Sequence, residues 1–325
     1  MSQELPKALQ EAIEAEVEST LKDLTSAREE LTERYRKSGH KGPFMTTELQ
    51  RQAYLSARMP ATYGAVHSVL QAIRERIKDM PIHTFLDLGS GPGTGLWAAC
   101  ETFPSIQKAV LIENDRSLAK WGQRLAQHSL NSVIQQAQWQ YDNLEELPCF
   151  PQHDMLLFSY SIGELAADLI PKVVEKSWNA AQQLLIVIEP GTPVGFERIR
   201  AIRRQLIEMG AFLVAPCPHH ASCPMTGGDW CHFSARVERN AFHRRLKGGS
   251  LSYEDEKFSY VAAAKTPCDL PPARILRHPM HRSGHSIFTL CTEQGVKQST
   301  ISKREEEYKA ARKWEWGDVF PLIPK

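Results

Sequence analysis

The chain has 325 residues, 42% hydrophobic and 24% charged, which is the composition of a globular protein with one large domain or two ordinary ones. It contains no apolar run of the roughly 18 residues that cross a bilayer, so we expect no membrane partner. The acidic residues 1–33 resemble neither a secretory signal nor an Arg-rich presequence, and this predicts a cytoplasmic protein with reduced thiols.

The formal net charge of +1 conceals an asymmetry along the chain. Residues 1–192 carry 18 Lys and Arg against 24 Asp and Glu, a balance of −6, whereas residues 193–325 carry 21 against 14, a balance of +7. A basic C-terminal part favours an anionic partner such as nucleic acid. The alternative is a solvated surface with an uneven spread of charge.

Residues 1–80 are predicted to form a helical N-terminal region. Apolar residues recur at helical spacing from 5 to 37, which predicts one long amphipathic helix. A second helix is expected to begin at Thr46 and Thr47 and to be interrupted at Pro60. A third helix is expected from 63 to about 78.

Residues 81–215 alternate between strand and helix patterns, as in a parallel sheet. The expected strands are 84–88, 109–113, 139–142, 154–160, 184–188 and 211–215, and the expected helices are 96–101, 117–129 and 196–209. Strands separated by helices form βαβ units. We therefore predict an α/β fold with a Rossmann-like core.

A glycine-rich loop, DLGSGPGTG from residue 87 to 95, follows the first expected strand. Glycine lets the backbone approach a ligand closely, and Glu113, 20 residues after Gly93, ends the second strand where a carboxylate can accept hydrogen bonds from ribose hydroxyls. The G-x-G-x-G spacing favours S-adenosylmethionine over a dinucleotide. The predicted cofactor-binding residues are Asp87, Gly89, Gly91, Gly93, Glu113 and Asp142. A tight turn of another α/β protein, or a fold that no longer binds cofactor, is the alternative.

Polar residues follow the fourth expected strand, where substrates bind in such sheets. Tyr160, Ser161 and Glu164 are therefore the candidate catalytic residues. The segment lacks the Asn/Asp-Pro-Pro-aromatic sequence of many amino-directed methyltransferases, so the methyl acceptor stays undefined. Glu164 could instead cap the following helix.

Three of the seven cysteines, Cys217, Cys223 and Cys231, lie within 15 residues, with the spacing C-x5-C-x7-C. A tetrahedral or cubane site needs a fourth thiolate, from Cys268 or Cys291. Both Cys217 and Cys223 precede proline, which favours an iron–sulfur cluster. Zinc is the alternative, and it could use histidine ligands at His219, His220 or His232. Buried, inert thiols are a further alternative.

Residues 216–325 are predicted to form a Cys-rich and basic region that completes the fold, with late strands near 260–263 and 286–290. Basic residues interleaved with Tyr308, Trp314 and Trp316 would suit RNA, because cations bind phosphates and aromatic rings stack on bases. Each basic group could also be a solvated face. The predicted RNA-binding residues are Arg236, Arg239, Arg244, Arg245, Lys303, Arg304, Arg312 and Lys313.

In combination, these motifs resemble the mitochondrial small-ribosomal-subunit methyltransferase-like family of assembly factors and its bacterial relatives. The resemblance covers nearly the whole chain. The segments that carry it are RMPATY (58–63), LDLGSGPGT (86–94), LWAA (96–99), SY through GEL (159–165), IEPGTP (188–193), the Cys217/Cys223/Cys231 run, YEDEKFSY (253–260), YKAARK (308–313) and WGD (316–318).

The resemblance implies a methyltransferase fold with an N-terminal helical extension and a [4Fe–4S] cluster held by Cys217, Cys223, Cys231 and Cys291. It also implies association with the small ribosomal subunit and its rRNA, by a chain that we expect to be monomeric. The missing organellar presequence points to a bacterial-type member. Two alternatives remain: an active S-adenosylmethionine-dependent rRNA methyltransferase, and a zinc- or cluster-dependent RNA-binding sensor.

Overall fold

The computed structural model describes residues 4–17, 21–36, 45–239 and 251–321. The chain divides into two compact units, which we describe separately. The first contains residues 1–70, 83–147 and 235–256, and the second contains residues 71–82, 148–234 and 257–325. No helix in the described ranges is both long and apolar enough to cross a membrane.

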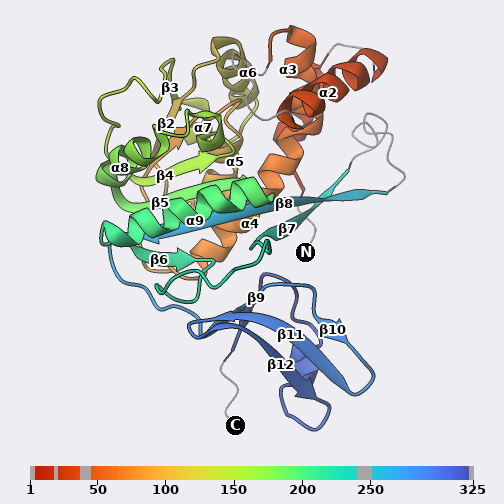
Figure 1. The fold of residues 1–325 in the computed structure, drawn as a ribbon. Coiled ribbons are helices and arrows are strands. Elements are labelled where there is room, and N and C mark those ends of the chain that lie inside the picture. The colour runs from red at the N-terminus through yellow and green to blue at the C-terminus, as the bar shows by residue number, and fades with distance from the viewer. Residues whose placement is uncertain (1–3, 18–20, 37–44, 240–250, 322–325) are drawn as a thin grey trace. The chain divides into compact units, whose positions relative to one another are not determined.

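The first unit is built around three parallel strands, in the order β3-β2-β1 (Figure 1). Its strands and the helices between them are β1 (Thr84–Leu88), α5 (Thr94–Thr102), β2 (Lys108–Ile112), α6 (Arg116–Gln127), α7 (Ser132–Gln135) and β3 (Gln138–Gln140). The four residues that follow the first of β1 and of β2 are all buried, as expected for parallel strands covered by helices. These βαβ units confirm the strand–helix alternation that the sequence predicts for this stretch.

The N-terminal helices differ from the prediction. They are α1 (Lys7–Glu16), α2 (Leu21–Arg36), α3 (Glu48–Ala57) and α4 (Met59–Arg74), of which the last continues into the second unit. The single helix predicted from 5 to 37 is wrong, because Val17 is already in an extended conformation. Pro60 does not interrupt a helix: it lies in the first turn of α4, where a missing N–H costs nothing.

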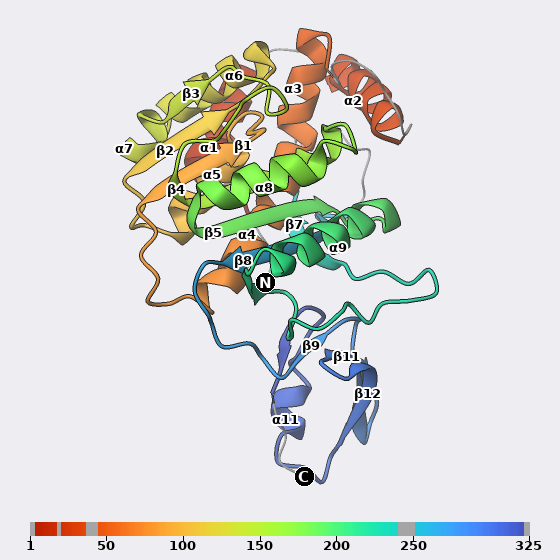
Figure 2. The ribbon, with the colours of Figure 1, turned by 60° about the vertical axis from the view of Figure 1, so that its left-hand side comes forward.

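The second unit holds a further set of strands, in the order β4-β5-β8-β6. The bounds are β4 (His153–Ser159), the 3-10 turn η1 (Ile162–Glu164), α8 (Ile170–Ala180), β5 (Ala181–Pro190), α9 (Pro193–Glu208), β6 (Phe212–Ala215), β7 (Phe233–Glu238) and β8 (Tyr253–Ala264). β4 and β5 are parallel, whereas β8 is antiparallel to both β5 and β6. Helices α8 and α9 both run alongside β5 (Figure 2).

A small five-stranded sheet completes the second unit. Its elements are β9 (Ala273–Ile275), β10 (Met280–His281), β11 (His285–Thr292), β12 (Gly295–Ser302), the short helix α11 (Tyr308–Ala311) and β13 (Val319–Phe320). Phe288 and Ile301 are fully buried at its core. The strands expected near 260–263 and 286–290 are confirmed within β8 and β11, whereas β7, inside the Cys-rich stretch, was not predicted.

Candidate functional site

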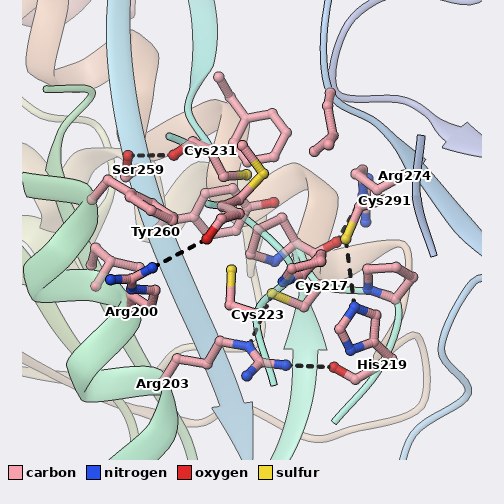
Figure 3. A pocket seen from close by; sticks show the side chains of 18 residues that line it. Arg200, Arg203, Cys217, His219, Cys223, Cys231, Ser259, Tyr260, Arg274 and Cys291 are labelled. Carbon is pink, nitrogen blue, oxygen red and sulfur yellow. Dashed lines mark hydrogen bonds between the residues drawn. The ribbon is translucent and has the colours of Figure 1, made fainter. Parts of the chain in front are cut away.

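Four cysteines that are far apart in the sequence line one pocket of the second unit (Figure 3). Cys217 and Cys223 lie in the segment after β6, Cys231 lies just before β7, and Cys291 lies on β11. The cavity has a volume of about 40 Å³. All seven cysteines of the chain are free thiols. The fold therefore gathers the three closely spaced cysteines and Cys291 around one cavity.

Burial makes the thiols of this pocket weak acids. It raises the pKa of Cys231 well above its ordinary value, and the neighbouring thiol of Cys217 adds to the shift. The pKa of Cys291 rises to about 12, from burial first and then from Cys217. Burial also raises the pKa of Cys223. These thiols are thus protonated at neutral pH, and any metal that binds them must displace their protons.

Cys268, the other candidate for a fourth ligand, does not line the pocket. Its thiol donates a hydrogen bond to the backbone oxygen of Leu213, at a distance of 3.2 Å. That contact gives Cys268 a place in the fold that requires no metal. Cys291 is the residue that shares the cavity with the three closely spaced cysteines.

The three histidines considered as zinc ligands lie in different surroundings. His219 is the one nearest a candidate thiol, with its Nε2 atom 3.5 Å from Cys291 Sγ. The Nε2 atom of His220 accepts a hydrogen bond from the backbone N–H of Leu213 at 2.9 Å. His232 stacks against Trp230, with the ring centroids 5.1 Å apart. Within the described residues, no group of three or more His, Cys, Asp or Glu side chains could hold a metal ion.

The glycine-rich loop of the first unit needs backbone freedom that only glycine supplies cheaply. Gly89, Gly91 and Gly93 all have positive φ angles, and Gly93 caps the start of α5 in the left-handed conformation. The carboxylate of Glu113 accepts hydrogen bonds from the backbone N–H groups of Gly91 and Asp115, each at 2.8 Å. Glu113 therefore ties the end of β2 to the loop.

Buried polar groups gather beside this loop. Asp87 is only 1% exposed, and neither of its carboxylate oxygens has a hydrogen-bond partner among the described residues. The hydroxyls of Ser90 and Thr94 are also buried without a partner in that part of the chain. Asp142 is exposed in the segment after β3. The loop thus presents polar groups that a ligand could satisfy.

The three candidate catalytic residues follow β4 in the second unit. Tyr160 has a φ of +59°, a left-handed conformation that a bulky residue rarely adopts. Its backbone N–H donates to the oxygen of Ile188 on β5 at 2.9 Å. Ser161 is buried, whereas Glu164 is exposed at the end of η1. Unusual backbone conformations concentrate at functional sites, so Tyr160 stays a candidate.

Two of the predicted RNA-binding arginines are paired within the chain. Arg236 donates from Nε to Asp255 at 3.0 Å, and Arg239 donates from Nη2 to Glu254 at 2.8 Å. Their charges are thus partly neutralised by carboxylates of the same unit. The predicted residues Arg244 and Arg245 lie outside the described residues.

The other four predicted RNA-binding residues lie near the small sheet of the second unit and are exposed: Lys303, Arg304, Arg312 and Lys313. Arg312 donates a hydrogen bond to the backbone oxygen of Arg282 at 3.3 Å, an acceptor that leaves its charge in place. These four cations, rather than the two paired arginines, are the better placed to meet phosphate.

A family model described as "Mitochondrial small ribosomal subunit Rsm22" matches residues 48–321 of the chain. The chain belongs to this family. The match covers more than half of the sequence and includes the glycine-rich loop and all four cysteines of the pocket. The family resemblance seen in the sequence is therefore confirmed.

Individual relatives of this Rsm22-family chain are distant. The human ribosome assembly protein METTL17, mitochondrial, is 25% identical over 296 residues, which cover 85% of this chain and 64% of that protein. The Rsm22-cox11 tandem protein 2, mitochondrial, of Schizosaccharomyces pombe is 24% identical over 332 residues, with 86% and 44% covered. The chain thus spans less than two thirds of either relative. A solved structure, magnesium protoporphyrin IX methyltransferase (ChlM) from Synechocystis PCC 6803, is similar with a TM-score of 0.42 and 14% identity, covering 76% of this chain and 99% of that one.

The predicted cytoplasmic, bacterial-type location is wrong. The family model and the human, fission-yeast and budding-yeast relatives are all named as mitochondrial. The prediction failed because it relied on the composition of residues 1–33, and such a pattern is weak evidence about the compartment of a distant relative.

Sequence reasoning missed the arginines and the carboxylate that line the second unit's sites. Arg203 and Arg274 are 5% and 4% exposed and both line the cysteine pocket. Glu189, 1% exposed at the end of β5, pairs with Arg198 and accepts from the backbone N–H of Gly163. No spacing in the sequence distinguishes these residues from the surface charges around them.

The stability of this Rsm22-family chain should fall as pH rises through the range in which Asp87 ionises. Burial, followed by the charge of Glu113, raises the pKa of Asp87 to about 8, from 3.8. The folded chain therefore holds a proton that the unfolded chain releases near pH 4, so stability declines between about pH 4 and pH 8.

Replacing Asp87 by Asn should flatten that decline in the ligand-free protein. Thermal unfolding at several pH values between 5 and 9 would measure it. Replacement of the exposed Asp142 by Asn is the control, and it should retain the wild-type slope. Equal slopes for Asp87→Asn and the wild type would refute a raised pKa at Asp87.

Proposed function

We propose that this chain is a methyltransferase-like [4Fe–4S] protein of the mitochondrion that binds the rRNA of the small ribosomal subunit and assists its assembly. The single observation that carries the proposal is the gathering of Cys217, Cys223, Cys231 and Cys291 around one cavity, in a chain of the Rsm22 family. The names of the human and budding-yeast relatives support the assembly role, because both are called ribosome assembly proteins.

The donor set fits a cluster better than a single zinc ion. Four-coordinate zinc holds each thiolate at about 2.3 Å, which places neighbouring sulfur atoms about 3.8 Å apart. The described residues contain no group of three or more His, Cys, Asp or Glu that could hold a metal ion. A cluster with an iron at each of four corners keeps its thiolates farther apart, and four cysteines around a cavity meet that need.

The chain's own residues supply the site. The four thiolates would hold the cluster, and Arg203 and Arg274 would place positive charge beside it. When bound, the cluster supplies a cross-link between the segment after β6 and strand β11, and iron–sulfur chemistry that responds to oxygen. The chain does the rest: it excludes water from Cys231 by burial and fixes Cys291 on a paired strand.

One anaerobic preparation tests the proposal. The wild-type chain is purified without oxygen, analysed for iron, sulfide and zinc, and sedimented with small ribosomal subunits. We expect iron and sulfide in nearly equal amounts, together with co-sedimentation. Colourless protein with stoichiometric zinc would overturn the cluster, and chain that stays in the supernatant would overturn the ribosomal role.

Binding of S-adenosylmethionine is a second candidate function, with rRNA methylation as its strongest form. The observation that favours it is the buried carboxylate of Asp87, which has no partner among the described residues and lies beside the glycine-rich loop. A ligand with a cationic amino group could satisfy such a carboxylate.

Calorimetry should therefore detect binding of S-adenosylmethionine to the wild-type chain. Asp87→Asn should weaken it by roughly tenfold, because a charged hydrogen-bond partner is lost. The exposed Asp168→Asn is the matched control and should bind like the wild type. An absence of heat at millimolar ligand would remove the methyl donor, and with it the methylation hypothesis, while leaving the cluster untouched.

A further inference from the structure

Arg203 lies on α9, between the cysteine-bearing segment and the body of the second unit. Although charged, it is only 5% exposed. Its Nε–H donates to Cys217 Sγ at 3.3 Å, and its Nη2 donates to the backbone oxygens of His219 and Ala221, each at 2.8 Å. One guanidinium therefore holds three points of a five-residue stretch (Figure 3).

These contacts need an arginine rather than a generic cation. A guanidinium presents five N–H donors in a fixed plane, whereas an ammonium is a point charge on a flexible stem. The two carbonyl acceptors satisfy part of a buried charge that would otherwise be costly to keep away from water. The stretch that Arg203 holds begins at Cys217 and ends just before Cys223, so the first two thiols of the set depend on it for position.

Arg203 also acts on the sulfur atoms through its charge. It lowers the pKa of Cys223 and of Cys291, although burial outweighs it in both cases. Its hydrogen bond to Cys217 favours the thiolate form of that residue in the same way. Hydrogen bonds to cluster sulfurs and nearby charge are among the factors that set the reduction potential of such sites.

We propose that Arg203 is a positioning residue of the cysteine pocket: it holds the 217–221 stretch ready for a cluster and raises the reduction potential of the bound cluster by its N–H···S bond and its charge. The second half of this proposal rests on the proposed cluster, and the first half does not. No contact with a substrate is involved, so Arg203 is not a catalytic residue.

The chain offers a matched control beside it. Arg204 is the next residue on α9, but its side chain is 76% exposed and pairs with Glu208 at 3.8 Å. The comparison therefore uses Arg203→Met, Arg203→Lys and Arg204→Met, each in the full chain purified without oxygen. Circular dichroism and thermal unfolding confirm that each variant is folded before it is compared.

The first measurement needs no cluster. Amide hydrogen exchange over residues 217–223 of the metal-free chain should be roughly tenfold faster in Arg203→Met and Arg203→Lys, because the anchoring hydrogen bonds are lost. Arg204→Met should exchange like the wild type. Wild-type exchange in both Arg203 variants would overturn the positioning role, whether or not a cluster binds.

The second measurement is the reduction potential of the iron-loaded protein, followed by its visible spectrum. Arg203→Met should shift the potential to a more negative value, Arg203→Lys should lie between it and the wild type, and Arg204→Met should show no shift. An unchanged potential in Arg203→Met would overturn the electrostatic role. Wild-type protein without iron and sulfide would instead overturn the proposed cluster, and the exchange measurement would still decide the role of Arg203 in the fold.

Discussion

Serine in place of Cys291 is expected to remove most of the iron and sulfide from the anaerobically purified chain, whereas serine in place of Cys268 is expected to leave both in place. Cys291 shares the cavity with the other three cysteines, and Cys268 instead donates its thiol hydrogen to the backbone of Leu213. The two cysteines therefore form a matched pair in which only one member faces the proposed cluster.

The loss should also lower the thermal stability of the chain. A group that binds the folded state but not the unfolded state stabilises the fold, and a cluster would link strand β11 to the segment after β6. Because burial raises the pKa of Cys291 to about 12, loading of the wild type should improve as pH rises from 7 to 9. The sign follows from the protons that the buried thiols must release.

Iron and sulfide analysis, the visible spectrum and the melting temperature check these expectations. The single observation most damaging to them would be a Cys291→Ser protein that keeps its colour and its iron. Equal losses in the two serine variants would mean that general destabilisation, rather than a lost ligand, explains the result.

The glycine-rich loop could be read from the sequence because its chemistry is local. Gly89, Gly91 and Gly93 have the positive φ angles that a tight strand-to-helix turn requires, and Glu113 reaches the loop from the end of β2. Its carboxylate accepts from the loop's own backbone, a detail that spacing alone does not reveal. The loop's conformation was thus predictable, and the partner of its carboxylate was not.

The cysteine site was predictable only in part, because it joins distant segments. Cys217, Cys223 and Cys231 stand out by their spacing, whereas the fourth residue depends on the pairing of β11 with β9, which carries Cys291 toward the pocket. The family resemblance, rather than the spacing, implied Cys291 over Cys268. Arg203 had no signal at all, because a helix with several arginines is usually read as a solvated surface.

The N-terminal helices failed for a different reason. Apolar spacing continues from 5 to 37, yet α1 ends at Glu16. Periodicity measures which face of a helix is apolar and says little about where the backbone turns. In the same way, Pro60 was taken as an interruption, although it lies in the first turn of α4.

Reversing the charges of Arg312 and Lys313 to glutamate is expected to weaken association of the chain with small ribosomal subunits by about tenfold or more at physiological salt. Both side chains are exposed beside the small sheet of the second unit. By contrast, Arg236 and Arg239 already pair with Asp255 and Glu254, so their contribution should be smaller.

Salt dependence separates phosphate contacts from a general effect of charge. If Arg312 and Lys313 meet phosphates, the slope of log affinity against log salt should decrease by about 1 for each lost contact. A matched reversal at the exposed Lys172 and Arg204 changes the net charge by the same amount, elsewhere in the same unit. Sedimentation at several salt concentrations should show full binding for that control. A control that binds as weakly as the test variant would mean that long-range repulsion, rather than a local rRNA contact, causes the loss, and the predicted RNA-binding role of Arg312 and Lys313 would then be wrong.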